Sequence, residues 1–273
     1  MMNFSFARQH FYEAIHQPQI NLAEAALYIA QEEYLNLEVE AYLNALDTMA
    51  DEVKERLPAE RYPLRILQTI NQYLYDDLGF TGNTTDYYDP RNSFLNEVID
   101  RRIGIPITLS LVYLEIAKRI DFPMVGVGFP GHFLIRPALD EMEIHVDPFH
   151  RGEILFNQDC QERLVQIYGP SVELRPVFFE EVSPQQFLIR MLNNLKHIYL
   201  EQNQISKCLA ATEQLLLIAP RATEELRDRG ILYYQLGRWA EARQDLEDYL
   251  ASDPQMEDLP LIHQILSRIG KEI

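Results

Sequence analysis

The chain has 273 residues, with 24 basic against 42 acidic side chains and a net charge of −18 at pH 7. Proteins that bind nucleic acid or an anionic membrane need a basic surface, so this charge argues against both as the main partner. No apolar run approaches the roughly 18 residues of a membrane span. The first residues also lack the basic-then-apolar order of a signal peptide, which predicts a cytoplasmic location.

The first 90 residues are predicted to form three amphipathic helices. Asn21 can cap the first of them. Apolar residues recur at helical spacing from Val39 to Leu57, and a third helix from Ile66 to Leu78 ends at Gly79. We expect their apolar stripes to be packing surfaces without a chemical role.

A turn-rich segment over 82–93 separates these helices from the middle of the chain. A short helix follows it, and Gly104 and Pro106 then open a longer buried helix, Ile107–Ile120. The next residues alternate with a period of two, which predicts three antiparallel strands over 124–129, 132–136 and 142–147. No glycine-rich phosphate-binding string occurs, so no nucleotide cofactor is expected.

The last third of the chain repeats itself. Pro220 and Pro254 are 34 residues apart, the period of tetratricopeptide helix pairs. Gly230 occupies the small position that such pairs need between their helices, whereas the first copy carries Lys196 in one of its glycine places. A capping helix is expected over Leu259–Ile269.

These patterns predict an α+β protein in three regions. Residues 1–90 form a helical region packed on the core, residues 91–183 form the core with its small antiparallel sheet, and residues 184–273 form the α-helical repeats.

Three features of the core belong to one chemical pattern. A helix opens at Gly104-Ile105-Pro106, one strand opens at His132, and another ends at Asp147. In papain-like and transglutaminase-like enzymes a helix N-terminus lowers the pKa of a cysteine thiol, a histidine takes its proton, and a carboxylate orients the imidazole. The order and spacing here fit that arrangement.

Three strings give a more specific resemblance: RRIGIPITLS, GFPGHFLIR and VDPF. Together they resemble the SirB1 family, and the resemblance covers nearly the whole chain. It implies a transglutaminase-like (papain-like) core followed by tetratricopeptide repeats.

The resemblance assigns two residues of a catalytic triad and not the third. His132 takes the place of the catalytic histidine and Asp147 that of its carboxylate partner, but Pro106 stands where the thiol should be. Proline has no nucleophile. The nearest hydroxyl groups, on Thr108 and Ser110, need far more activation than a thiol.

The chain has only two cysteines, which excludes a disulfide framework and a cysteine zinc cage. We expect Cys160 and Cys208 to be buried small side chains, with recruitment of Cys160 as a displaced nucleophile as a minor alternative. His145, Asp147 and His150 are three possible metal ligands close together in the sequence, with His145 and Asp147 on one strand face. Because Pro148 bends the chain before His150, we expect structural histidines and no metal site.

Three functions remain open. The first is a protein-binding scaffold, a pseudoenzyme that lacks the cysteine and binds a protein or peptide partner through its repeats. The second is a hydrolase or acyltransferase for amide or ester bonds, using His132 and Asp147 with a non-cysteine nucleophile or with water. In both, Asp147 can also serve simply to hold two strands in register. The third is a regulator of gene expression, which with this charge would act through another protein.

Overall fold

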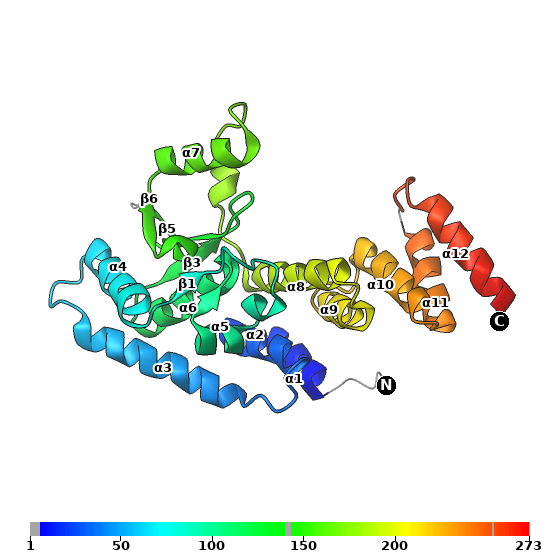
Figure 1. The fold of residues 1–273 in the computed structure, drawn as a ribbon, viewed down its shortest axis with the longest axis horizontal. Helices are drawn as coiled ribbons and strands as arrows, with labels where there is room; N and C mark the ends of the chain where they lie inside the picture. The colour runs from blue at the N-terminus through cyan, green and yellow to red at the C-terminus, as the bar shows by residue number, and fades with distance from the viewer. Residues whose placement is uncertain (1–5, 140–142, 253, 273) are drawn as a thin grey trace. The chain divides into compact units, whose positions relative to one another are not determined.

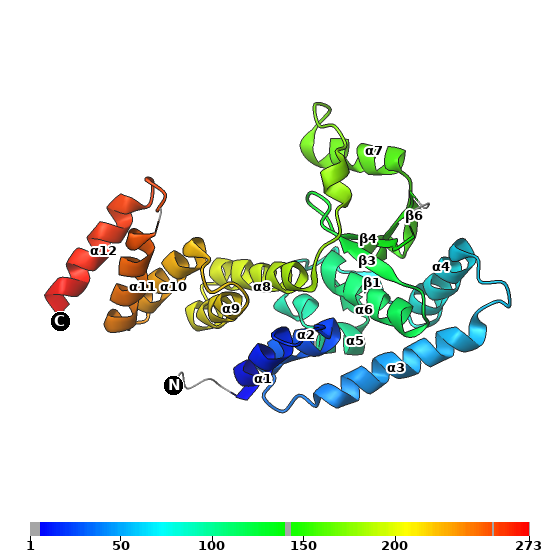
Figure 2. The same cartoon turned by 180° about the vertical axis from the view of Figure 1, so that it is seen from behind.

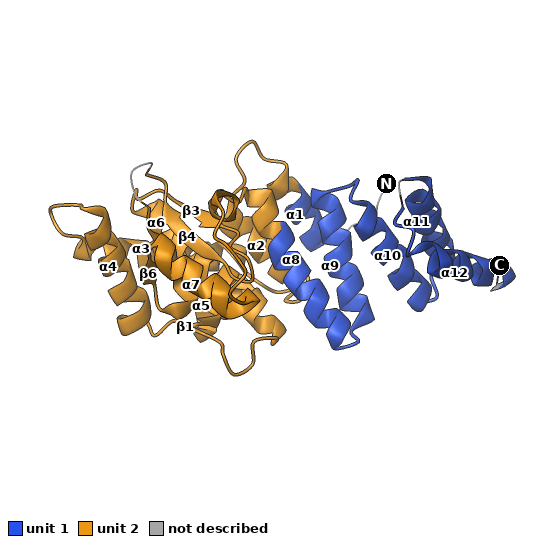
Figure 3. Ribbon diagram, turned by 90° about the horizontal axis from the view of Figure 1, so that it is seen from above, with its two compact units in different colours: residues 1–12, 189–273 blue, residues 13–188 orange. Residues whose placement is uncertain are grey.

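The computed structural model describes residues 6–139, 143–252 and 254–272. Figure 3 shows its two compact units, Glu13–Leu188 and the pair of segments Met1–Tyr12 and Ile189–Ile273. Within the described residues, no helix combines the length and the apolar character needed to cross a bilayer.

The larger unit begins with helices and continues into a sheet covered by helices. Its helices and helical turns are α1 (Phe6–Ile15, which starts in the other unit), α2 (Leu22–Gln31), α3 (Val39–Arg56), α4 (Pro63–Asn71), η1 (Gln72–Asp77), η2 (Pro90–Ser93), α5 (Leu95–Arg101), α6 (Pro106–Arg119), η3 (Pro148–His150), α7 (Asn157–Tyr168) and η4 (Pro176–Phe179). Its strands are β1 (Thr81–Gly82), β2 (Ile103–Gly104), β3 (Met124–Val127), β4 (Leu134–Pro137), β5 (His145–Asp147) and β6 (Glu153–Leu155).

Four of the strands form an antiparallel sheet in the order β3-β4-β5-β6. Residue pairs fix its register: Val125 lies opposite Arg136, and Asp147 lies opposite Glu153. The short strands β1 and β2 pair separately, in parallel. The α+β class predicted from the sequence is therefore confirmed.

Helix α6 occupies the centre of this unit. Eleven of its fourteen residues are buried, and it packs against α2, α3, α4, α5 and two strands of the sheet. Pro106 starts it at the position where a missing backbone N–H is tolerated, as the sequence predicts. The first helices therefore form one side of the core rather than a separate layer.

The opposite face of the sheet is covered by α7 (Figure 1). A second apolar cluster fills the space between them: Val127, Phe129, Leu134, Leu155, Cys160 and Leu164, with four partly buried residues of the 172–179 segment. His145 and Asp147 are two residues apart on β5, so their side chains lie on the same face of the sheet. Asn157 and Arg163 of α7 lie beside them, which shows that this is the face that α7 covers.

The smaller unit is helical and follows the predicted repeat. It contains α8 (Pro184–Glu201, which starts in the larger unit), α9 (Ile205–Ile218), α10 (Thr223–Gln235), α11 (Trp239–Ala251) and α12 (Leu259–Glu272), seen from behind in Figure 2. A Cβ added to Gly230 would lie 2.7 Å from Leu246 Cδ2, so the close approach of α10 and α11 requires glycine there.

The structure differs from the sequence-based prediction at several elements, and the first is α1, which precedes the three predicted N-terminal helices. Strand β6 and helix α7 follow the predicted sheet and were not anticipated, and the loop over 82–93 contains the helical turn η2. The predicted strand over 132–136 begins only at Leu134, which leaves His132 in the preceding turn, where its N–H donates to Phe129 O. The strand expected from residue 142 is described from His145, and residue 142 lies outside the described residues.

Candidate functional site

Asp147 is the centre of the site that the sequence predicts. It ends β5 and is fully buried. Its Oδ1 accepts hydrogen bonds from the backbone N–H groups of Phe149 and His150, at 3.0 and 3.2 Å. The carboxylate thus caps the turn η3, a local reason for finding Asp before Pro at this corner.

The other oxygen, Oδ2, gathers three side chains. His132 Nε2 and His150 Nδ1 each lie 2.8 Å from it, and the Arg163 guanidinium of α7 donates to it as well. Arg163 also pairs with Glu153 at 2.5 Å. The structure therefore brings His132 and Asp147 together as the sequence predicts, and adds His150 and Arg163 to them.

The electrostatics of this cluster keep Asp147 ionised. Burial on its own would raise the pKa of the carboxyl group, but the hydrogen bonds to His132 and His150 and the charge of Arg163 hold the pKa well below its usual range. Asp147 is therefore a fixed negative charge at any physiological pH. It can hold an imidazole in one tautomer and orientation, which is the task of the carboxylate in a catalytic triad.

His132, Asp147 and His150 also offer ligand atoms that lie within 4.8 Å of one another. A divalent cation bound between them would meet the Arg163 guanidinium, which contacts the same carboxylate oxygen. Like charges at that distance repel, so the residues present do not fit a metal ion. His150 lies beside Asp147 even though Pro148 bends the chain between them.

The side chains at and near the expected nucleophile position are buried. Pro106 is buried at the start of α6. Thr108 is completely buried, and its Oγ1 donates to Asn92 O at 2.7 Å and accepts from Ile105 N at 3.1 Å. Ser110, two residues further along α6, is also completely buried, and its Oγ has no hydrogen-bond partner among the described residues.

The two thiols are buried as expected. Cys160 belongs to the apolar cluster beneath α7, and burial raises its pKa to about 11. Cys208 lies between repeat helices with its Sγ 3.6 Å from Lys196 O, and burial raises the pKa of that thiol too. Both are protonated at neutral pH, so neither supplies a ready thiolate.

A pocket of about 410 Å³ opens beside the cluster. His132, His150 and Arg163 line one part of it, and the remaining lining combines Phe129, Leu155 and Ile167 with the polar side chains Glu153, Asp159, Glu162 and Gln166. The Phe149 ring stands 6.0 Å from the His132 ring, and a Cβ added to Gly82 would lie 2.6 Å from it. An aromatic side chain therefore fills the space between His132 and the β1 strand.

The repeat unit has a groove of its own, about 480 Å³ in volume. Leu216, Leu226 and Tyr233 form apolar parts of its lining. Its arginines are each paired: Arg8 with Glu213, Arg229 with Asp245 at 2.6 Å, and Arg238 with Glu241. Arg238 also stacks over the Tyr233 ring, 4.2 Å from its centroid. The groove is apolar in the middle and lined by charges of both signs.

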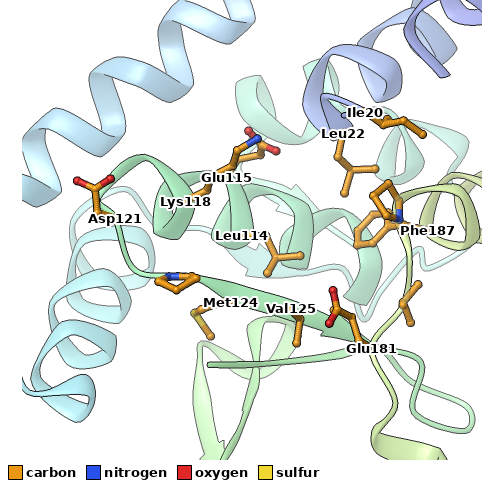
Figure 4. A pocket seen from close by; sticks show the side chains of 14 residues that line it. Ile20, Leu22, Leu114, Glu115, Lys118, Asp121, Met124, Val125, Glu181 and Phe187 are labelled. Atoms are coloured by element: carbon orange, nitrogen blue, oxygen red, sulfur yellow. The ribbon is translucent and has the colours of Figure 1, made fainter. Parts of the chain in front are cut away.

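Figure 4 shows a further hollow, about 540 Å³, between α6 and the edge strand β3. Leu114 of α6 lies on one side of it and Met124 and Val125 of β3 lie on the other, and Lys118 and Asp121 also line it. None of the residues predicted to take part in chemistry lines it.

Arg163 and Phe149 are the site residues that sequence reasoning missed. Arg163 lies on α7, whose twelve residues include only two buried ones, Cys160 and Leu164. Those two residues lie four apart on one helix face, and this weak signal alone could have predicted the helix.

Comparisons with known proteins agree with this architecture. A family model described as a transglutaminase-like superfamily matches residues 40–193, and a tetratricopeptide repeat model matches residues 195–267. A UPF0162 protein of Xylella fastidiosa is 35% identical over 259 residues, which cover 92% of this chain and 90% of that protein. The UPF0162 protein YchA of Escherichia coli is 30% identical over 221 residues, 81% of this chain and 79% of that protein.

Part of the chain also matches a longer protein. Human F-box only protein 21 is 32% identical over 188 residues, which cover 65% of this chain and only 29% of that protein. By these matches the chain belongs to the UPF0162 family within the transglutaminase-like superfamily.

Proposed function

We propose that this chain is a non-catalytic interaction protein, in which a transglutaminase-like core without its cysteine is joined to repeats that bind a protein or peptide partner. One observation carries the proposal: the three side chains considered as replacements for the missing thiol are all buried. Thr108, Ser110 and Cys160 are each fully buried, and Pro106 holds the position that the resemblance assigns to the thiol. We also assign the chain to the SirB1 family, and its location to the cytoplasm.

The residues that remain of the triad support a structural role for Asp147. Its carboxylate accepts from two backbone N–H groups, two imidazoles and a guanidinium, which ties β5, η3, α7 and the turn before β4 together. A triad carboxylate needs its charge to stabilise an imidazolium. The Arg163 guanidinium contacts the same carboxylate oxygen and offsets that charge.

A partner is proposed to bind in the groove of the repeat unit. Its apolar lining near Leu226 suits apolar side chains of an extended peptide, and Arg238 at its edge can exchange Glu241 for an acidic group of the partner. Repeats of this kind present such concave surfaces to other proteins. The net charge of −18 favours a protein partner over nucleic acid.

The binding half of the proposal is tested by selecting peptides from a displayed library on the full chain and measuring their affinity for two variants. Arg238→Glu reverses a charge in the groove, and Arg221→Glu makes the same change at an exposed position outside it. We expect a loss of about tenfold in affinity for Arg238→Glu and little change for the control. Equal losses, or no selectable peptide, would refute binding in this groove.

The catalytic half is tested by assaying the full chain for amine incorporation and for hydrolysis of peptides and esters. We expect no turnover that depends on His132. Turnover that is lost in His132→Ala would support the second candidate, a hydrolase or acyltransferase. The observation that favours this candidate is the intact contact of 2.8 Å between His132 and Asp147 beside an open pocket, where the imidazole could activate water.

A further inference from the structure

A second pocket on the covered face of the sheet has the features of a binding site. It has a volume of about 520 Å³, in the range of small-molecule sites, and shares no lining residue with the pocket beside Asp147. Its lining comes from β4, β5, the start of α7 and the segment before α8: Arg136, Leu139, Glu143, His145, Asn157, Leu174, Arg175, Pro176 and Phe179.

His145 is the feature of this pocket that calls for a ligand. The residue is only 4% exposed, and its ring stacks on Phe179 with centroids 4.1 Å apart and planes within 6°. The Asn157 side chain interacts with the imidazole, but the Nδ1 atom is buried and has no hydrogen-bond partner among the described residues. A buried polar atom without a partner is costly to a folded protein, which favours a ligand or a water molecule that satisfies it.

The charges around His145 select an anion. The charge of Arg136 lies close enough to His145 to lower the pKa of its imidazole, and Arg175 lines the same pocket. Neither guanidinium forms an ion pair with another described residue. Among the described residues that line the pocket, Glu143 is the one acidic side chain, and it accepts from Asn157 Nδ2 at 3.3 Å. Two guanidinium groups against one carboxylate give this described lining a net charge of +1, which suits a monoanion better than a dianion.

The other lining residues indicate what the uncharged part of the ligand is. Leu139, Leu174 and Pro176 offer an apolar wall, against which an apolar group can be buried. We propose that this pocket binds a small organic carboxylate. Its carboxylate pairs with Arg136 and Arg175, a neighbouring polar group reaches Nδ1 of His145, and its apolar part lies against Leu139, Leu174 and Pro176. Guanidinium groups match carboxylates in geometry, which makes arginine the expected partner.

The test uses 4-fluorohippurate, which combines a carboxylate, an adjacent amide N–H and an aromatic ring, and follows its fluorine signal on titration with the full chain. The uncharged primary amide of the same compound serves as the matched ligand. We expect saturable binding of the acid, at least about tenfold weaker binding of the amide, and a shift of the His145 ring resonances with the acid only. No saturable binding, or equal binding of both compounds, would overturn the proposal.

Four variants locate the binding. Arg136→Met and Arg175→Met should each weaken the acid about tenfold, whereas Glu143→Gln should tighten it by removing the opposing charge. Arg61→Met removes an exposed arginine outside the pocket and should leave the affinity within about twofold. A loss in Arg61→Met equal to that in Arg136→Met would show unspecific attraction, and tighter binding of phenyl phosphate than of 4-fluorohippurate would overturn the assignment to a carboxylate.

Discussion

Asp147 determines how the core site should respond to mutation and pH. The negative charge of Asp147 pairs with the guanidinium of Arg163, which is only 18% exposed. Removal of that negative charge leaves Arg163 largely buried and with a weaker interaction at this position. We expect Asp147→Asn to lower the free energy of unfolding by about 3 kcal/mol at pH 7, measured by chemical denaturation.

The matched control is Asp76→Asn, because Asp76 pairs with Arg151 on the surface, where both side chains are more than half exposed. That change should cost less than about 1 kcal/mol. Folding lowers the pKa of Asp147, so its ionised carboxylate stabilises the folded protein at pH values above the pKa of the same group in the unfolded chain. The difference between wild type and Asp147→Asn should therefore shrink as the pH falls below about 4. Equal costs for the two variants would contradict this role of Asp147.

His145 should make the protein sensitive to mild acid. Burial and then the charge of Arg136 lower its pKa to about 4. The unfolded chain takes up a proton at this residue near pH 6.5 and the folded chain does not, so stability should fall by roughly 2 kcal/mol between pH 6.5 and 4. His145→Phe keeps the ring on Phe179 and should flatten that part of the stability curve. An unchanged curve would show that His145 does not titrate as described.

Pro106 offers a gain-of-function test at the same scale. A cysteine placed there would lie at the N-terminus of the fourteen-residue helix α6, where the helix dipole lowers a thiol pKa. Pro106 is buried, as Cys160 is, so the two thiols differ mainly in the helix N-terminus at position 106. We expect Pro106→Cys to react with iodoacetamide at pH 7 at least about tenfold faster than Cys160, since one pKa unit changes the thiolate fraction about tenfold. Pro106→Ser controls for folding. Alkylation no faster than that of Cys160 would contradict the alignment of Pro106 with a catalytic thiol.

At the scale of elements, the repeat depends on close helix packing at Gly230. Alanine favours helices, but its Cβ would lie 2.7 Å from the Leu246 side chain. Gly230→Ala should therefore destabilise the protein by about 1–3 kcal/mol. Gly270→Ala in α12 is the matched control, because its Cβ meets only Arg243 Nη2 at 3.7 Å, and it should stabilise by up to about 1 kcal/mol. Thermal unfolding of both variants measures this, and a stabilising Gly230→Ala would refute the packing argument.

The elements that the sequence predicted well are those with a strong periodic pattern. Both ends of helices α3 and α6 lie within one residue of their predicted positions. Both helices are long, so their apolar residues form patterns that extend over several turns. Helix α7 buries only Cys160 and Leu164, and β6 is three residues long, so neither produced a readable period. Arg163 was missed for that reason, since a residue on an unpredicted helix cannot be placed beside Asp147.

The pairing of His132 with Asp147 could be predicted because both positions came from a resemblance that spans the core. The pocket around His145 could not, because it depends on Arg136, Asn157 and Arg175, which are far apart in sequence and meet only through the register of the sheet and the path of the segment after α7. Local pattern carries no information about such contacts.

At the scale of the whole molecule, the chain combines a transglutaminase-like core with repeats. The structure divides the chain into two compact units, Glu13–Leu188 and the segments Met1–Tyr12 and Ile189–Ile273. The division into three regions, with boundaries at residues 90 and 183, stays a prediction from the sequence. We propose that the two parts have separate tasks: the repeats bind a partner, and the core holds a site built on Asp147. The division of tasks depends on the absence of a working nucleophile in the core.

Covalent trapping followed by intact mass spectrometry tests that claim most directly. The full chain is treated with iodoacetamide for thiols and with a fluorophosphonate for hydroxyl groups, and His132→Ala is treated in parallel. We expect no adduct in the wild type that depends on His132, because Thr108, Ser110 and Cys160 are buried and both thiols are protonated. A stoichiometric adduct on any of these three residues that disappears in His132→Ala would contradict it.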